Sequence, residues 1–115
     1  MLLLSTPEPR DLQENYALAK CAYQRGSEPV VGMVVHGVRR RRDAEHAFDR
    51  LANAAVRHLG HSPVSYGLLA DDLHVYRAIA SRRPIGLEHP QSRAARALRD
   101  VARMLYEDAE KMTLV

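Results

Sequence analysis

The chain has 115 residues and a mass of 12.9 kDa, which suffices for one domain with a modest core and predicts a single domain over residues 1–115. Hydrophobic residues make up 46% of the chain and charged residues 27%, a composition that excludes disorder throughout. The formal net charge of +3 comes from fifteen arginines and two lysines against fourteen acids, so anionic partners have to be considered.

Targeting segments and disulfides are not expected. No apolar run approaches the roughly 20 residues that cross a bilayer, and Met1–Leu4 is too short for the apolar region of a signal peptide. We therefore expect a cytoplasmic protein without membrane insertion. The single cysteine, Cys21, cannot close an internal disulfide, and its place in a helical pattern predicts a small core residue rather than a reactive thiol.

The first half of the chain predicts strand, helix, strand and helix in turn. Leu2–Ser5 is a short apolar run that ends at two prolines, and Asp11–Gly26 repeats apolar residues at helical spacing. Val30–His36 is apolar without alternation, which is typical of a strand covered on both faces. Asp43–Gly60 predicts a second helix, with Asp43 as its cap and the glycine just past its end.

The second half continues the alternation and fixes the fold class. A strand is predicted over Pro63–Leu69, and a short helix follows that Asp71 or Asp72 caps, that runs through Ile79 and that Arg82–Pro84 ends. A loop holding Gly86 and Pro90 then leads to a last helix from Ser92. Leu98, Val101, Leu105 and Ala109 share one face of that last helix. Strands that alternate with helices pair in parallel, so we expect a three-layer α/β domain with about three parallel strands and about four helices.

Ligands of a parallel sheet gather at the carboxyl ends of its strands, which here are Thr6–Glu8, His36–Gly37 and Ala70–Asp72. His36 could exchange a hydrogen bond with a ligand, or it could cap its strand in solvent. Asp71 and Asp72 could bind a metal ion or a ribose hydroxyl, or they could cap the helix that follows. The sequence leaves both pairs of alternatives open.

The sequence lacks the motifs of the common phosphate-binding loops and of metal sites. Neither Gly-x-x-x-x-Gly-Lys-Ser/Thr nor Gly-x-Gly-x-x-Gly occurs, so tight binding of a nucleotide phosphate, and hence a cofactor, is not expected of this chain alone. Asp43, His46 and Asp49 recur at steps of three, which drift around a helix, and no metal site is expected. Arg39–Arg42 is either a solvated loop or a phosphate-binding surface.

Seven segments of the chain form a pattern when they are taken together and in order. They are Leu2–Pro9, Val34–His36, Ala47–Leu51, Arg57–Gly60, Tyr66–Asp72, Asp72–Ile85 and Pro90–Ala97. This pattern resembles the later half of the ParA/MinD family of P-loop ATPases. The likeness covers the chain from Leu2 to about Leu105, and the branch it resembles most is the FlhG/FleN-like flagellar-number regulators.

This resemblance implies a partial P-loop NTPase fold of MinD type. Family members bind ATP with Mg²⁺, but their Walker A lysines and switch aspartates lie in the half that has no counterpart here. The family holds adenine with an asparagine at a strand end and with a Pro-x-Asp loop. This chain has His36 and Ala70 in place of the asparagine and the proline and keeps the aspartate as Asp72. The resemblance thus assigns His36 and Asp72 to the adenine side.

The function implied is that of a truncated or degenerate MinD/ParA-like ATPase that is not catalytically competent alone. Its role would be regulatory, in flagellar number and placement or in cell-division positioning. The alternative is a stand-alone protein- or nucleic-acid-interaction module that binds no nucleotide. Because the family pairs the Leu2–Ser5 strand with the strand that carries the P-loop, we expect an open sheet edge that takes a protein partner or a second copy. Arg39–Arg42 would be the surface for nucleic acid.

Overall fold

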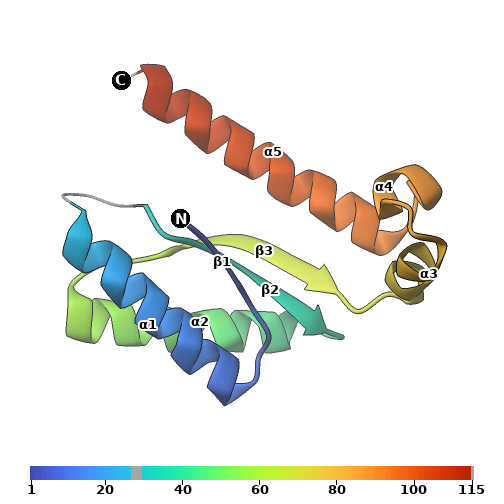
Figure 1. Cartoon of the computed structure of the whole chain (residues 1–115). Coiled ribbons are helices and arrows are strands. Elements are labelled where there is room, and N and C mark those ends of the chain that lie inside the picture. Colours follow the sequence, from blue (N-terminus) through green and yellow to red (C-terminus); the bar gives the residue numbers. More distant parts are fainter. Residues whose placement is uncertain (27–29, 115) are drawn as a thin grey trace.

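The chain folds into three layers around a small parallel sheet. The structure, a computed structural model, describes residues 1–26 and 30–114, with side chains up to residue 110. α1 and α2 cover one face of the sheet and α5 lies over the other, while α3 and α4 sit beyond the carboxyl ends of the strands (Figure 1). The elements are β1 (Leu2–Ser5), α1 (Pro9–Arg25), β2 (Gly32–Val38), α2 (Arg41–Leu59), β3 (Val64–Ala70), α3 (Leu73–Ser81), α4 (Ile85–Glu88) and α5 (Arg93–Leu114).

The sheet confirms the α/β expectation and has the strand order β1-β2-β3, with both pairs parallel. β2 is therefore central, and its side chains alternate between two cores. Met33 and Val35 join the core under α1 and α2, whereas Val34 packs with Tyr66 and Val101 of α5 on the opposite face. The side chains of Met33, Val34 and Val35 are each at most 2% exposed. Because both faces of β2 are buried here, the sequence does not alternate between polar and apolar residues.

A close approach between Gly32 and Tyr66 sets the packing under α5. A Cβ atom on Gly32 would stand 2.0 Å from Cε2 and 2.4 Å from Cδ2 of the Tyr66 ring. That ring is held in place, because its hydroxyl donates a 2.5 Å hydrogen bond to Asp108 of α5. The bond to Asp108, together with burial, raises the pKa of Tyr66 to about 12. Glycine at position 32 thus makes room for the side chain that anchors α5 to the sheet.

Several predicted boundaries were wrong by two residues or more. α2 begins at Arg41 rather than at Asp43, and its N-cap residue Arg40 makes no side-chain capping bond. β2 continues past His36 to Val38, because Gly37 adopts a φ of +70° where the pairing with β3 shifts register. The described residues contain five helices rather than about four, since α4 forms within the predicted loop.

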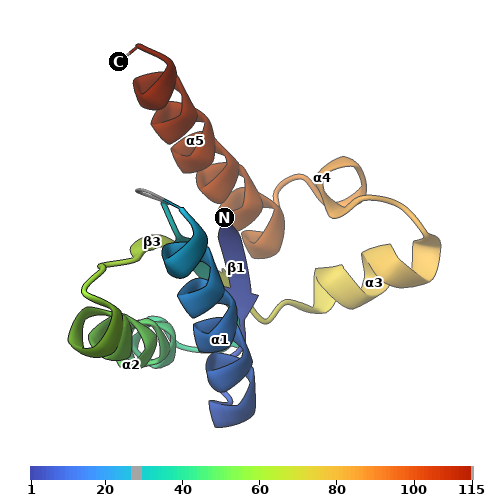
Figure 2. The ribbon, with the colours of Figure 1, turned by 60° about the vertical axis from the view of Figure 1, so that its left-hand side comes forward.

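Two predicted core positions are exposed. Cys21 lies on the outer side of α1, two residues from buried Ala19 and from buried Tyr23, which places it on the opposite side of the helix. Leu98 was expected on the packed face of α5, but it is 43% exposed. α5 packs chiefly on β3, and the outer strand β1, which lies beside α1 in Figure 2, keeps Leu2 and Leu4 exposed.

β1 forms an open edge of the described sheet. Leu3 is buried under α1, whereas Leu2 and Leu4 face the uncovered side and are 40% and 57% exposed. Part of the edge is blocked in a way the sequence did not predict, because the buried Asn15 of α1 donates a 3.1 Å hydrogen bond from Nδ2 to the carbonyl of Leu4. The edge therefore keeps apolar side chains but presents fewer free backbone groups than expected.

Membrane insertion finds no support among the described residues. None of their helices combines the length and the apolar character that crossing a bilayer requires.

Gly32→Ala should destabilise the fold strongly, since neither the strand backbone nor the anchored Tyr66 ring can move away cheaply. We expect a loss of about 3 kcal/mol in the free energy of unfolding, measured by urea denaturation. Gly86→Ala is the matched control, because a Cβ atom there meets nothing within 4 Å. Equal stability of the two variants would show that the Tyr66 ring is not fixed over β2.

Candidate functional site

The candidate site lies at the carboxyl edge of the sheet, where all three parallel strands end together. Two cavities open there. The larger, of 470 Å³, is bounded by the turn after β1, the end of β2 and the first three turns of α2. The second, of 370 Å³, lies between the end of β3, the start of α3 and the start of α5. Arg39 lines both cavities and forms the ridge between them.

Polar side chains stiffen the turn after β1. The Thr6 hydroxyl donates a short hydrogen bond to the Asp11 carboxylate and accepts one of 3.3 Å from the backbone N–H of Glu8. Asn15, which also bonds to Leu4, donates a hydrogen bond of 3.0 Å to the backbone carbonyl of Asp11. These contacts hold the start of α1 against the end of β1, so one wall of the larger cavity has a fixed shape.

Asp72 connects two helix N-termini. Its Oδ1 accepts a 2.9 Å hydrogen bond from the backbone N–H of His74, which makes it the N-cap of α3, and its Oδ2 accepts one of 3.0 Å from the backbone N–H of Ala94 in α5. These backbone bonds, with a further contact to the His74 ring, lower the pKa of Asp72 to about 2. The capping interpretation of Asp72 is thereby confirmed, and its carboxylate binds protein groups first.

Neighbouring groups complete this junction between α3, α4 and α5. Ser92 donates to the carbonyl of His89 at 2.7 Å and accepts from the N–H of Ala95 at 3.2 Å, so it caps α5 beside Asp72. The His89 and His74 rings lie 4.8 Å apart, centroid to centroid, at 57°. Asp71 is exposed and accepts a 3.2 Å bond from the Tyr76 hydroxyl. No group of three or more His, Cys, Asp or Glu side chains within the described ranges could hold a metal ion.

His36 and Asp72 lie at the same edge but do not form one site in this structure. Asp72 lines the 370 Å³ cavity, and His36 does not belong to its lining. The His36 side chain is exposed on β2, two residues before the strand ends. Their assignment to the adenine side stays a prediction.

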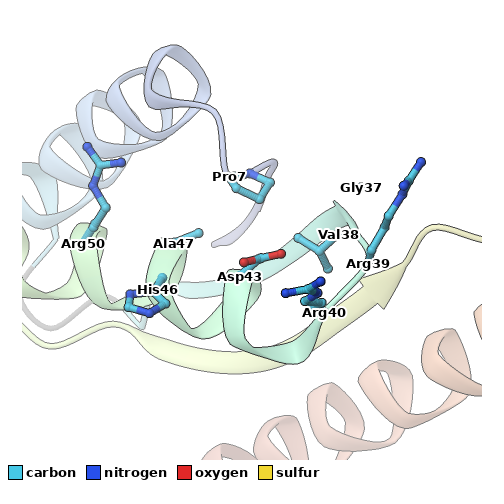
Figure 3. Close-up of a pocket in the computed structure, with 9 residues that line it drawn as sticks. All are labelled: Pro7, Gly37, Val38, Arg39, Arg40, Asp43, His46, Ala47 and Arg50. Carbon is cyan, nitrogen blue, oxygen red and sulfur yellow. The ribbon is translucent and has the colours of Figure 1, made fainter.

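The run Arg39–Arg42 is divided between a turn and a helix. Arg39 and Arg40 lie in the turn after β2, whereas Arg41 and Arg42 form the first turn of α2, and all four side chains are exposed. Cations at a helix N-terminus repel its dipole, which Asp43 in the first turn offsets only in part. Figure 3 shows Arg50 at one end of the larger cavity and Arg39 at the other, with Asp43 and Arg40 between them.

Tertiary structure adds one basic residue that the sequence did not single out. Arg93, at the start of α5, lines the 370 Å³ cavity with Arg39 and lines another cavity with Arg41. More than fifty residues separate Arg93 from the run, so no local pattern could have joined them. The carboxyl edge thus carries arginines from two elements around the acidic pair Asp71 and Asp72.

No family model matches this chain, and no curated protein sequence matches it either.

Stability at low pH should depend on Asp72. Because the folded state lowers its pKa from 3.8 to about 2, this carboxylate contributes stability above pH 4 that is lost as the pH falls through about 2. Asp72→Asn should therefore flatten the fall of the urea midpoint between pH 4 and pH 2. Asp71→Asn, one residue away, is the control and should keep most of the wild-type slope. Identical slopes for wild type and Asp72→Asn would contradict the role of Asp72 as a cap of two helices.

Proposed function

We propose that this chain corresponds to the later part of a ParA/MinD-like P-loop ATPase domain, truncated or degenerate, that acts as a cytoplasmic regulator and does not catalyse by itself. The observation that carries this proposal is the placement of the resembling segments. Thr6–Pro9 follows β1, Val34–His36 belongs to β2, and Tyr66–Asp72 runs along β3 to the start of α3. All three therefore reach one edge of a sequentially ordered parallel sheet.

Two further features support the proposal. Pro90–Ala97 leads into α5, whose first turn is tied to Asp72, the one residue of the adenine-side pattern that the chain keeps. The outer face of β1 is apolar and uncovered at Leu2 and Leu4, which fits a strand that pairs with another segment. Regulation of flagellar number and placement, or of cell-division positioning, is the role that the family resemblance suggests.

A stand-alone interaction module is the second candidate. It is favoured by the exposed arginines at the carboxyl edge, because none of Arg39–Arg42 forms an ion pair with a carboxylate of the described residues. Sequencing the DNA upstream of the Met1 codon distinguishes the ATPase fragment from the stand-alone module. An in-frame stretch that encodes a glycine-rich P-loop supports the ATPase fragment, whereas an unrelated gene supports the module.

The purified chain should release no phosphate from ATP and Mg²⁺ above a buffer blank. The reason is that the sequence has no glycine-rich loop with a lysine to hold the β- and γ-phosphates. A malachite-green assay over several hours tests this, with an intact MinD-type ATPase as the positive control. Turnover that disappears in Asp72→Ala would show that the chain is catalytically competent alone.

Self-association or partner binding through β1 should depend on Leu4. At tens of micromolar, wild type should elute ahead of a monomer in size-exclusion chromatography, and Leu4→Lys should elute as a monomer, because a charge there blocks edge pairing. Leu3 does not serve for this test, since it is buried in the core. Leu18→Lys is the matched control, a leucine of α1 that is 51% exposed. A wild-type monomer peak would contradict self-association through this edge.

A further inference from the structure

A groove runs along α2 on the side that faces α1. Its first part is the 470 Å³ cavity at the carboxyl edge, and its second part is a 310 Å³ cavity between α1 and α2. Arg50 lines both parts, so they meet at its side chain. We call this feature the α2 groove. Residues of α2 from Asp43 to His58 form one wall, Pro7 and the first turns of α1 form the facing wall, and Arg39 and Arg40 lie at the end near β2.

The spacing of the α2 residues makes the groove one continuous stripe. Asp43, Ala47, Arg50, Ala54 and His58 follow one another at steps of three or four, which keeps them on one side of a helix. At 1.5 Å per residue, the stretch from Asp43 to His58 is about 22 Å long. That length equals the length of a helical segment of about 15 residues.

The floor of the second part is apolar. Leu12 and Leu51 form its base, at 6% and 2% exposure, and the half-buried Tyr16 and Ala54 flank them. Phosphate-binding surfaces gain nothing from such a floor, whereas the apolar face of an amphipathic helix can bury its side chains there. The shape and chemistry of this part therefore favour a protein segment over nucleic acid.

The charge along the groove is one-sided. Asp43 is the only acid in the lining of the two cavities, and it stands against five basic or imidazole side chains: Arg39, Arg40, His46, Arg50 and His58. In the described part of the chain, none of the three arginines forms an ion pair with a carboxylate. The α1 acid nearest in sequence to Gln13, Glu14, is paired with Arg10 at 3.6 Å. A complementary occupant carries negative charge beside its apolar side chains.

We propose that the α2 groove is a docking surface for an acidic amphipathic helix of a partner protein. Its apolar side chains would enter the cavity over Leu12 and Leu51, and its carboxylates would pair with Arg50 and with Arg39 and Arg40 at the open end. The groove lies on the opposite face of the sheet from the uncovered side of β1. The groove is therefore separate from the open edge of β1, and its docking role does not require the ATPase resemblance.

The test uses the whole chain, labelled with ¹⁵N, and a synthetic peptide of about 15 residues. The peptide has leucine at every third or fourth position and glutamate elsewhere; a second peptide replaces each glutamate by lysine. We expect saturable amide shifts along Leu12–Tyr16 and Ala47–His58 with the glutamate peptide only. Added salt should weaken this binding.

Three variants locate the binding. Arg50→Gln removes the charge shared by both cavities and should weaken binding about threefold. Ala54→Leu should also weaken it, because the added side chain fills the apolar floor, and a purely electrostatic contact would not respond to that change. Arg77→Gln is the control, an exposed arginine of α3 that lines neither cavity. The amide spectrum of each variant shows whether it is folded.

Three results would overturn the proposal. The first is the absence of saturable shifts with the glutamate peptide at millimolar concentration. The second is equal binding of the lysine peptide, which would leave charge complementarity without effect. The third is a short DNA duplex that shifts the same amides at lower concentration than the peptide, because the groove would then be a nucleic-acid surface.

Discussion

The fold depends on the burial of β2 on both faces. β1 and β3 both pair with it, and among the described strands it has fully buried side chains in both cores, with Met33 and Val35 on one side and Val34 on the other. A small domain buries a limited share of its surface, so a strand that contributes apolar area twice is its most effective element. The positions of three helices follow from this strand, since α1 and α2 cover one face and α5 the other.

The two faces of the sheet are closed to different extents. The α1 and α2 face has a continuous core of twelve buried residues, whereas the α5 face has a cluster of three, centred on Tyr66. The Gly32–Tyr66 approach, the bond to Asp108 and the packing of Val101 and Leu105 hold α5 there, and the side of β1 beyond them stays open. The open face lies beside the unpaired edge of β1, which is why self-association and partner binding are proposed for that strand.

The helix N-termini at the carboxyl edge of the sheet differ in how they are capped. Asp72 and Ser92 cap the two helix starts beyond β3, so that side of the carboxyl edge is satisfied within the protein. The start of α2 is different, because an arginine occupies its N-cap position and makes no side-chain capping bond. Basic groups that no described carboxylate pairs with gather on this second side and continue along the α2 groove. The proposed docking of an acidic helix concerns this side of the molecule for that reason.

The sequence by itself determined the alternation of strands and helices, the parallel sheet and the two-sided burial of β2, because apolar periodicity and capping residues act within a few positions of the chain. The helical pattern predicted the wrong side of α1 for Cys21, which is exposed. The predicted end of β2 at His36 was also wrong, because the strand continues past an irregularity at Gly37. Only the tertiary structure decided the pairs that are distant in sequence, such as Asp72 with Ala94, Asn15 with Leu4, and Arg93 beside Arg39. Those contacts depend on how the elements dock, and docking is set by three-dimensional packing that no local pattern encodes.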